Sequence, residues 1–197
     1  MMMSKSIYRF VLVSSMLAAS AAVQGAAPDP AAAWPNKPLR VVVPFTPGSA
    51  TDAVARFVTE RLGPQLGQTF VIENRTGASG TIGMAIVSKA NPDGYTILIH
   101  SSSYTVTPTT YPNAPYDTLR DFSGITPLAN IPNVLVITPA KGIRSVKDLI
   151  ASAKAKPGSL TYASAGAGSA TQLNAEHFRL GARLQGVHVP FKGTPEA

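Results

Sequence analysis

Short apolar runs alternate with segments of helical periodicity along most of the chain. Residues 39–45 (LRVVVPF) have the continuous apolar pattern of a strand that is buried on both faces of a parallel sheet. After a loop at residues 46–51, the pattern predicts a helix that Gly63 and Pro64 end. The apolar positions of that helix are Val54, Phe57, Val58 and Leu62.

The same alternation continues through the next stretch. We expect a strand at residues 69–73, a turn-rich loop at 74–80 and a short helix at 81–89. The NPDG turn at residues 91–94 then precedes a strand at 95–100. This β-α-β-α-β order predicts a parallel sheet with right-handed crossovers, and so the α/β class.

The middle of the chain is different. Residues 101–123 are rich in Ser, Thr, Pro and Tyr and predict an irregular connection. Apolar, partly β-branched runs then predict two more strands, at residues 125–129 and 134–138.

A second set of alternating elements follows. Ser145 and Asp148 have the spacing of a capping box, which predicts the start of a helix. Its expected apolar face consists of Val146, Leu149, Ile150 and Ala153. After a stop at Pro157-Gly158, we expect a strand at 160–163, a glycine loop at 164–170, a helix at 171–180 and a strand at 187–191.

The N-terminus has the three regions of a secretory signal peptide. Residues 1–9 carry two positive charges, residues 10–23 are uncharged and apolar, and residues 24–33 are small and rich in Ala and Pro. We therefore expect residues 1–33 to be a signal peptide that exports the protein to the bacterial periplasm. An uncleaved anchor is the alternative, but the apolar run is shorter than the roughly 20 residues of a membrane span. Cleavage after Gly25 and after Ala33 both remain open.

Composition and charge exclude several classes of protein. The 197 residues contain no Cys, which excludes disulfides, thiolate zinc sites, Fe–S clusters and cysteine nucleophiles. The 17 Lys+Arg and 10 Asp+Glu give a net charge of +7, but the basic residues are scattered singly. Since a phosphate-binding surface needs clustered positive charge, we expect no nucleic-acid partner.

No catalytic or metal-binding motif is present in the sequence. It contains no GxSxG, SxxK, HExxH or GxxxxGK pattern, and the glycines at 166–168 form only an incomplete dinucleotide fingerprint. His100, His177 and His188 have no ligand-like spacing, and we expect His177 to be structural. The sequence thus predicts no enzyme, metal or cofactor, and a secreted hydrolase remains the least favoured class.

Two similar loops are the strongest candidates for a binding site. Residues 44–52 and 164–173 each lead from the carboxyl end of a strand into a helix through Gly, Ser and Thr. Helix N-termini offer free backbone N–H groups and partial positive charge, so such loops can bind anionic oxygens without Lys or Arg. The alternative is that Ser49 with Asp52 and Ser169 with Gln172 only cap their helices.

Several motifs in fixed order resemble one known family. They are WPNKPLRVVVPFTPG at residues 34–48, ENRTGASG at 73–80, NPDGYT at 91–96, YDTLRDF at 116–122, PNVLV at 132–136, SAGAGS at 164–169 and HVPFKG at 188–193. The mature chain thereby resembles the substrate-binding proteins of tripartite tricarboxylate transporters, also called Bordetella uptake gene (Bug) proteins.

The resemblance implies a periplasmic-binding-protein-like (type II) fold with two lobes, at residues 34–128 and 129–197. It also implies a receptor that captures a small carboxylate, such as a di- or tricarboxylate, an acidic amino acid or an aromatic acid, and delivers it to inner-membrane permease subunits. A periplasmic sensor that feeds a two-component signalling system is the alternative. No cofactor or metal is implied. The ligand-binding positions carried over are Phe45, Thr46, Gly48, Ser49, Asp52, Ser164, Ala165, Gly166, Gly168, Ser169 and Thr171, with Asp52 expected to brace its loop.

The chain departs from the family pattern at a few positions. Ser49 stands where a second glycine is usual, and it would be strained if the position needs a positive φ. Gln172 replaces a usual His, and Phe191 a usual Tyr. Family members also continue well beyond residue 197, so the resemblance implies a second lobe that is incomplete at the C-terminus.

Overall fold

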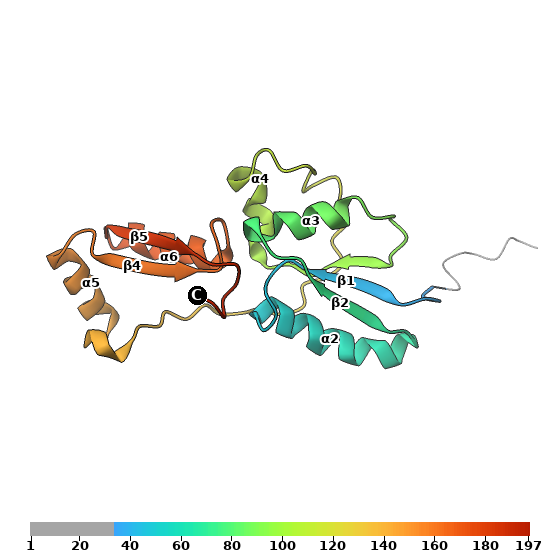
Figure 1. Ribbon diagram of the computed structural model, residues 1–197, viewed down its shortest axis with the longest axis horizontal. Helices are drawn as coiled ribbons and strands as arrows, with labels where there is room; N and C mark the ends of the chain where they lie inside the picture. Colours follow the sequence, from blue (N-terminus) through green and yellow to red (C-terminus); the bar gives the residue numbers. More distant parts are fainter. Residues whose placement is uncertain (1–33) are drawn as a thin grey trace, which may run out of the picture. The chain divides into compact units, whose positions relative to one another are not determined.

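The computed structural model describes residues 34–197, and the predicted signal peptide lies outside the described residues (Figure 1). The strands are β1 (Leu39–Val43), β2 (Phe70–Asn74), β3 (Thr96–Leu98), β4 (Leu160–Ser164) and β5 (Gly186–Pro190). The α-helices are α2 (Ala50–Leu66), α3 (Thr81–Ser88), α4 (Thr107–Thr110), α5 (Val146–Ala155) and α6 (Ala170–Gly181). Short 3₁₀ turns are η3 (Ala78–Gly80), η4 (Ser102–Val106) and η5 (Pro139–Lys141).

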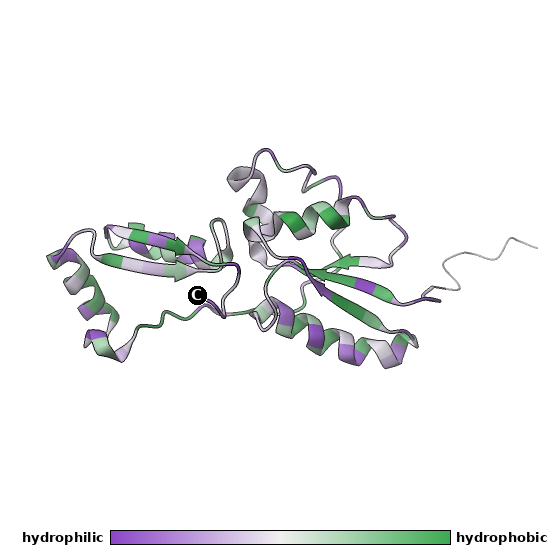
Figure 2. Ribbon diagram, viewed as in Figure 1, coloured by the Kyte–Doolittle hydropathy of each residue, from purple (hydrophilic) through white to green (hydrophobic). Residues whose placement is uncertain are grey.

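The first sheet is parallel and has the strand order β2-β1-β3. In its register, Val41 of β1 pairs with Ile72 of β2 and with Ile97 of β3. Helices α2 and α3 cover opposite faces of the sheet, so the central strand β1 is the most apolar and the most buried (Figures 1 and 2). Val41 and Val43 pack on Ala55 of α2, as expected for alternate residues of one strand. The parallel sheet with crossover helices is therefore confirmed.

The second sheet consists of β4 and β5, also parallel, with Tyr162 opposite His188. Helix α5 begins at its predicted cap, where the Ser145 side chain accepts a hydrogen bond from the Asp148 N–H. Of the face expected for α5, Leu149 and Ala153 are buried, whereas Val146 is 53% exposed. The expected face is therefore buried at Leu149 and Ala153 and open to solvent at Val146, the first residue of α5.

The strands predicted at residues 125–129 and 134–138 are wrong. Both segments lack regular secondary structure, and Ile125, Val134 and Val136 are each about 80% exposed. An apolar run becomes a strand only when another strand pairs with it, and within residues 34–197 none does. The boundary predicted between the two lobes, at residues 128 and 129, falls within the first of these segments and stays a prediction.

The predicted end of α2 at Gly63-Pro64 is also wrong, because the helix continues to Leu66. Gly67 ends it in the left-handed conformation (φ 63°) and donates its N–H to the Gly63 carbonyl. A glycine at this position is a stronger stop than a proline in the last turn. Among residues 34–197, no helix is both long and apolar enough to cross a membrane.

Candidate functional site

Two turns of the same geometry lead into α2 and α6. The Thr46 carbonyl accepts a hydrogen bond from the Ser49 N–H at 3.1 Å, and the Gly166 carbonyl accepts one from the Ser169 N–H, also at 3.1 Å. Of the four residues in each turn, the third has a left-handed φ, 79° at Gly48 and 82° at Gly168, and the second does not. These are the features of a type II turn, which needs a glycine at its third position. Ser49 itself has a φ of −65°, so the strain considered for it does not exist.

Both helices are capped as their sequences predict. The Ser49 hydroxyl accepts the Asp52 N–H at 3.3 Å, and the Ser169 hydroxyl accepts the Gln172 N–H at 3.2 Å. The side chains at the third helical position reach back in turn: Asp52 accepts the Gly48 N–H at 2.9 Å and Gln172 accepts the Gly168 N–H at 3.0 Å.

Capping leaves the first two backbone N–H groups of each helix without intrahelical partners. These donors belong to Ala50 and Thr51 in α2, and to Ala170 and Thr171 in α6. The two interpretations of the loops are therefore compatible: Ser49 and Ser169 cap their helices, and donors remain for an anionic oxygen.

Both helix starts line one cavity of about 750 Å³. Its wall includes the first residues of α2 and α6 and contains no Lys, Arg, Asp or Glu. Apolar side chains such as Phe45, Ile99 and Leu128 share the wall with amides and hydroxyls. A ligand in this cavity would therefore meet positive potential from helix ends rather than from charged side chains.

The predicted site residues divide into two groups. Those on the cavity wall are Phe45, Ser49, Ala165, Ser169 and Thr171. Those that do not line it are Thr46, Gly48, Asp52, Ser164, Gly166 and Gly168, of which Gly166 lines an adjacent cavity of about 230 Å³. The sequence analysis missed His100, Tyr104, Asn130, Asn133 and Asn174 on the main wall.

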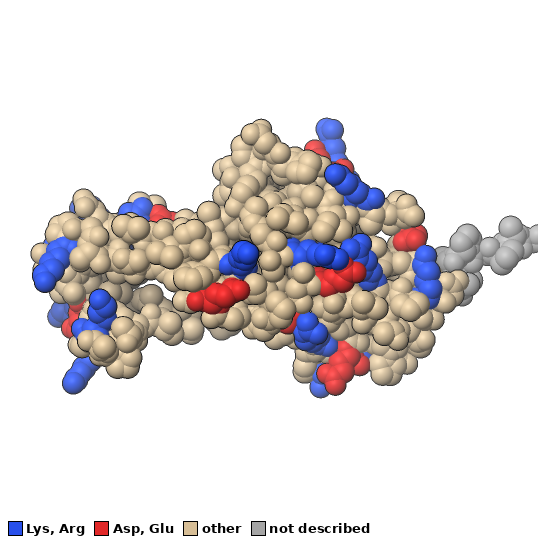
Figure 3. Space-filling model, in the orientation of Figure 1, with Lys and Arg blue, Asp and Glu red and all other residues tan. Residues whose placement is uncertain are grey.

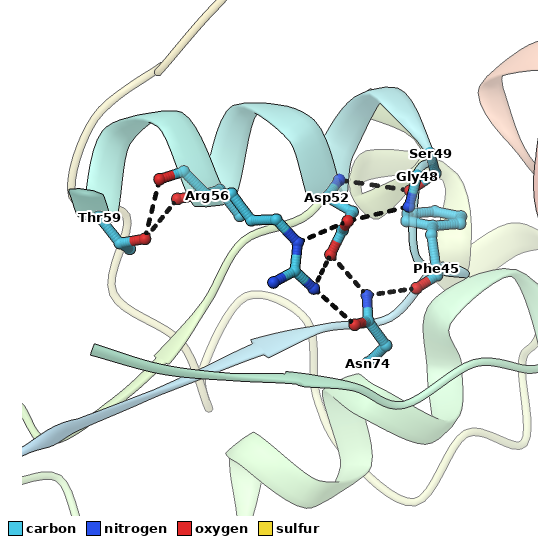
Figure 4. Close-up of polar contacts among 8 residues, drawn as sticks. Phe45, Gly48, Ser49, Asp52, Arg56, Thr59 and Asn74 are labelled. Atoms are coloured by element: carbon cyan, nitrogen blue, oxygen red, sulfur yellow. Dashed lines mark hydrogen bonds and ion pairs between the residues drawn. The ribbon is translucent and has the colours of Figure 1, made fainter. Parts of the chain in front are cut away.

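Asp52 holds the first turn, as expected (Figure 4). Its side chain is 3% exposed and accepts bonds from Arg56 at 2.9 and 3.0 Å and from the Asn74 amide at 2.8 Å. The same Asn74 amide donates to the Phe45 carbonyl at 2.9 Å, which ties β2 to the end of β1. Burial disfavours the charged carboxylate, but the bonds from Arg56, Asn74 and Gly48 outweigh it and lower the pKa of Asp52.

Hydrogen bonds of Ser164 and Thr171 hold the second loop. The Thr171 hydroxyl accepts the Ala165 N–H at 3.0 Å, and the Ser164 hydroxyl lies 2.7 Å from His188 Nε2. A serine hydroxyl at this distance from a histidine has the spacing of a nucleophile–base pair, and sequence spacing did not reveal the contact. Ser164 is 1% exposed and lines neither of the two cavities, so the pair serves the structure of the loop. His177, expected to be structural, is exposed on α6.

His100 follows β3 at the carboxyl end of the first sheet, on the cavity wall. Its ring packs edge-on against Phe45 and Tyr104, with centroids 5.3 and 6.1 Å away. Nδ1 lies 3.0 Å from the Ser101 carbonyl, an acceptor, so Nδ1 carries the proton and Nε2 is the bare nitrogen. Nε2 is buried and has no partner among the described residues. Burial therefore lowers the pKa of His100 to about 4, against the opposing effect of the Ser101 bond.

This lowered pKa predicts a specific acid sensitivity. The unfolded chain takes up a proton at the ordinary pKa of 6.5, whereas the folded chain resists protonation until about 4. The contribution of His100 to the free energy of unfolding should thus be greatest above pH 6.5. It should decrease as the pH drops from about 6.5 to about 4. Urea denaturation of the wild type and of His100→Asn, which cannot titrate, tests this. An equal decline in both proteins within that window would contradict it.

The charged side chains are dispersed over the described surface. On the face drawn in Figure 3, Lys and Arg lie scattered among acidic residues. Several are paired: Glu73 bonds both Arg40 and Arg75, which lowers the pKa of Glu73 to about 2. Within residues 34–197, no group of three His, Asp or Glu side chains is placed to hold a metal ion.

Comparison with known proteins identifies the family. Residues 54–197 match the family described as TctC, the tripartite tricarboxylate transporter family receptor. The chain belongs to this family. The TctC family description is that of a receptor rather than an enzyme, and the resemblance inferred from the motifs is confirmed.

Relatives of this TctC chain include Bug proteins. Protein BugT of Bordetella pertussis (strain Tohama I) is 37% identical over 191 residues, which are 96% of this chain and 58% of BugT. The chain spans about half the length of the curated relatives it matches.

Solved structures of similar proteins have the same fold. The R. palustris protein Rpa4515, solved with adipate, is 37% identical, with a TM-score of 0.80 over 83% of this chain and 55% of that one. The periplasmic binding protein BugD is 31% identical, with a TM-score of 0.69 over 83% of this chain and 55% of BugD. The periplasmic-binding-protein fold with parallel sheets is therefore confirmed for this TctC chain.

Proposed function

We propose that this protein is a periplasmic receptor that binds a small carboxylate through the N-termini of α2 and α6. The observation that carries the proposal is that both helix starts line one cavity whose wall bears no charged residue. Two helix starts on the wall of one cavity that also carries apolar side chains suit a ligand that has two carboxylates on an apolar body. Adipate, present with the similar R. palustris protein, has this chemistry.

The surroundings of the free backbone N–H donors at the two helix starts favour an anionic ligand. Within residues 34–197, the backbone N–H groups of Ala50, Thr51, Ala170 and Thr171 have no intrahelical acceptor. Each helix dipole adds partial positive charge at the same point. The hydroxyls of Ser49 and Ser169 are engaged in capping, and the Thr171 hydroxyl bonds the Ala165 N–H and the Ser169 hydroxyl. Ligand recognition therefore relies on the backbone N–H groups and on the wall amides.

A thermal-shift screen tests the proposed ligand class. We expect adipate, malate and other dicarboxylates to raise the melting temperature in a concentration-dependent way, because a ligand that binds only the folded state stabilises it. Neutral sugars and amides serve as the comparison set. Stabilisation by neutral solutes, with no response to any carboxylate, would contradict the proposal.

The proposal extends to delivery and location. Membership of a tripartite transporter receptor family supports a role in passing the bound carboxylate to inner-membrane permease subunits. The signal-peptide pattern of residues 1–33 supports export to the periplasm. Co-purification of the permease with the tagged receptor, in the presence of ligand, tests the delivery step.

A further inference from the structure

The two type II turns differ in what holds their central peptide. Type I and type II turns differ in the orientation of the peptide between the second and third residues. In the turn at residues 46–49 the second residue is Pro47, whose ring fixes φ near the value that this position needs. In the turn at residues 166–169 the second residue is Ala167, which imposes no such restriction.

Two hydroxyl groups from outside the loop bind the central peptide of the second turn. The Ala167 carbonyl accepts hydrogen bonds from the Ser79 hydroxyl and from the Tyr111 hydroxyl, the latter at 2.9 Å. The N–H of the same peptide, on Gly168, donates to the Gln172 side chain at 3.0 Å. The peptide is therefore held at both ends, and its N–H bond is part of the cap of α6.

Ser79 reaches the loop from an unfavourable backbone conformation. Ala78 and Ser79 have φ values of 44° and 51°, in the left-handed region that non-glycine residues rarely adopt. Such strain persists only where surrounding contacts maintain it. The close approach also needs a glycine opposite, since a Cβ on Gly166 would lie 3.2 Å from the Ser79 hydroxyl and 3.2 Å from the Phe191 carbonyl.

We propose that Ser79 and Tyr111 are positioning residues that hold the 167–168 peptide in its type II orientation and so form the α6 end of the cavity. They supply in this turn the restriction that Pro47 supplies in the other. Without them the peptide can flip, which takes the Gly168 N–H away from Gln172 and loosens the helix start whose donors face the ligand. The inference rests on the proposed function for the ligand, but the state of the turn can be measured without one.

The test combines loss of the hydroxyls with a proline rescue. We expect the double variant Ser79→Ala/Tyr111→Phe to speed hydrogen exchange at the Gly168 amide by about tenfold and to weaken adipate binding by a similar factor. Adding Ala167→Pro should restore both, because proline favours the type II turn without replacing either hydrogen bond. Ala167 is exposed, so the ring has room. Tyr116→Phe is the control, since its hydroxyl bonds Met84 Sδ instead.

Unchanged exchange at Gly168 in the double variant would overturn the inference. Faster exchange that Ala167→Pro fails to slow would also overturn it, because the hydroxyls would then act only by holding distant segments together. Should the double variant not fold, Tyr111→Phe with and without Ala167→Pro decides the same question. If the exchange pattern is as expected and adipate does not bind the wild type, the positioning role stands and it is the proposed adipate ligand that fails.

Discussion

Replacing Ala170 with Asp is expected to weaken carboxylate binding strongly while leaving the protein folded. Ala170 is the first residue of α6 and lines the cavity next to the free N–H groups of the helix. An acidic residue in the first turn stabilises a helix by about 0.3–1 kcal/mol, so stability should not fall. A carboxylate about 4 Å from the ligand would repel it by roughly 4 kcal/mol at an effective dielectric constant near 20. Calorimetric titration should show binding weakened by at least about 100-fold.

The matched control is Val146→Asp. Val146 is the first residue of α5 and half exposed, and it does not line the cavity. The Val146→Asp substitution therefore introduces the same charge at the same helical position without approaching the ligand, and carboxylate binding should be unchanged. Equal loss of binding in both variants, or retained binding in Ala170→Asp, would show that the start of α6 does not hold the anion.

Replacing Asp52 with Ala is expected to give the largest loss of stability. The buried carboxylate accepts bonds from the Gly48 N–H, from Asn74 and twice from Arg56. Removing it leaves the Gly48 N–H and the Asn74 amide short of acceptors, while Arg56, whose side chain is 53% exposed, can be hydrated. The free energy of unfolding should fall by about 2–3 kcal/mol, below the cost of breaking a fully buried ion pair.

Urea denaturation measures this loss, with two comparisons. Asp52→Asn keeps an acceptor for the Gly48 N–H and should lose about half as much. Glu60→Ala, on an exposed position of the same helix, should change stability by less than about 0.5 kcal/mol. A change of that small size in Asp52→Ala would mean that the first turn does not depend on its carboxylate.

Much of this architecture is predictable because the signals are local. Periodicity gives the order of strands and helices, and the Ser49 and Ser169 caps follow from spacings of three residues. The errors arise where the outcome depends on distant partners. Residues 125–129 and 134–138 have the composition of strands, but pairing decides whether a strand forms.

The candidate site also has features that the local sequence predicts and features that depend on distant residues. Both glycine loops are visible in the sequence, and their meeting at one cavity follows the rule that ligands bind at the carboxyl ends of parallel strands. The wall residues Asn130, Asn133 and Asn174 were missed because no local pattern marks an amide that faces a cavity. The bonds from Ser79 and Tyr111 to Ala167 join positions more than 50 residues apart and leave no trace in sequence spacing.

Calorimetric titration of the protein with adipate and with adipamide, its neutral diamide, tests the central claim most directly. The two molecules share length and apolar body and differ in the charge at their ends. If the starts of α2 and α6 bind carboxylates, adipate should bind measurably and adipamide should bind at least about 100-fold more weakly, because helix ends favour negative charge. Equal affinity for both, or a preference for adipamide, would contradict the account.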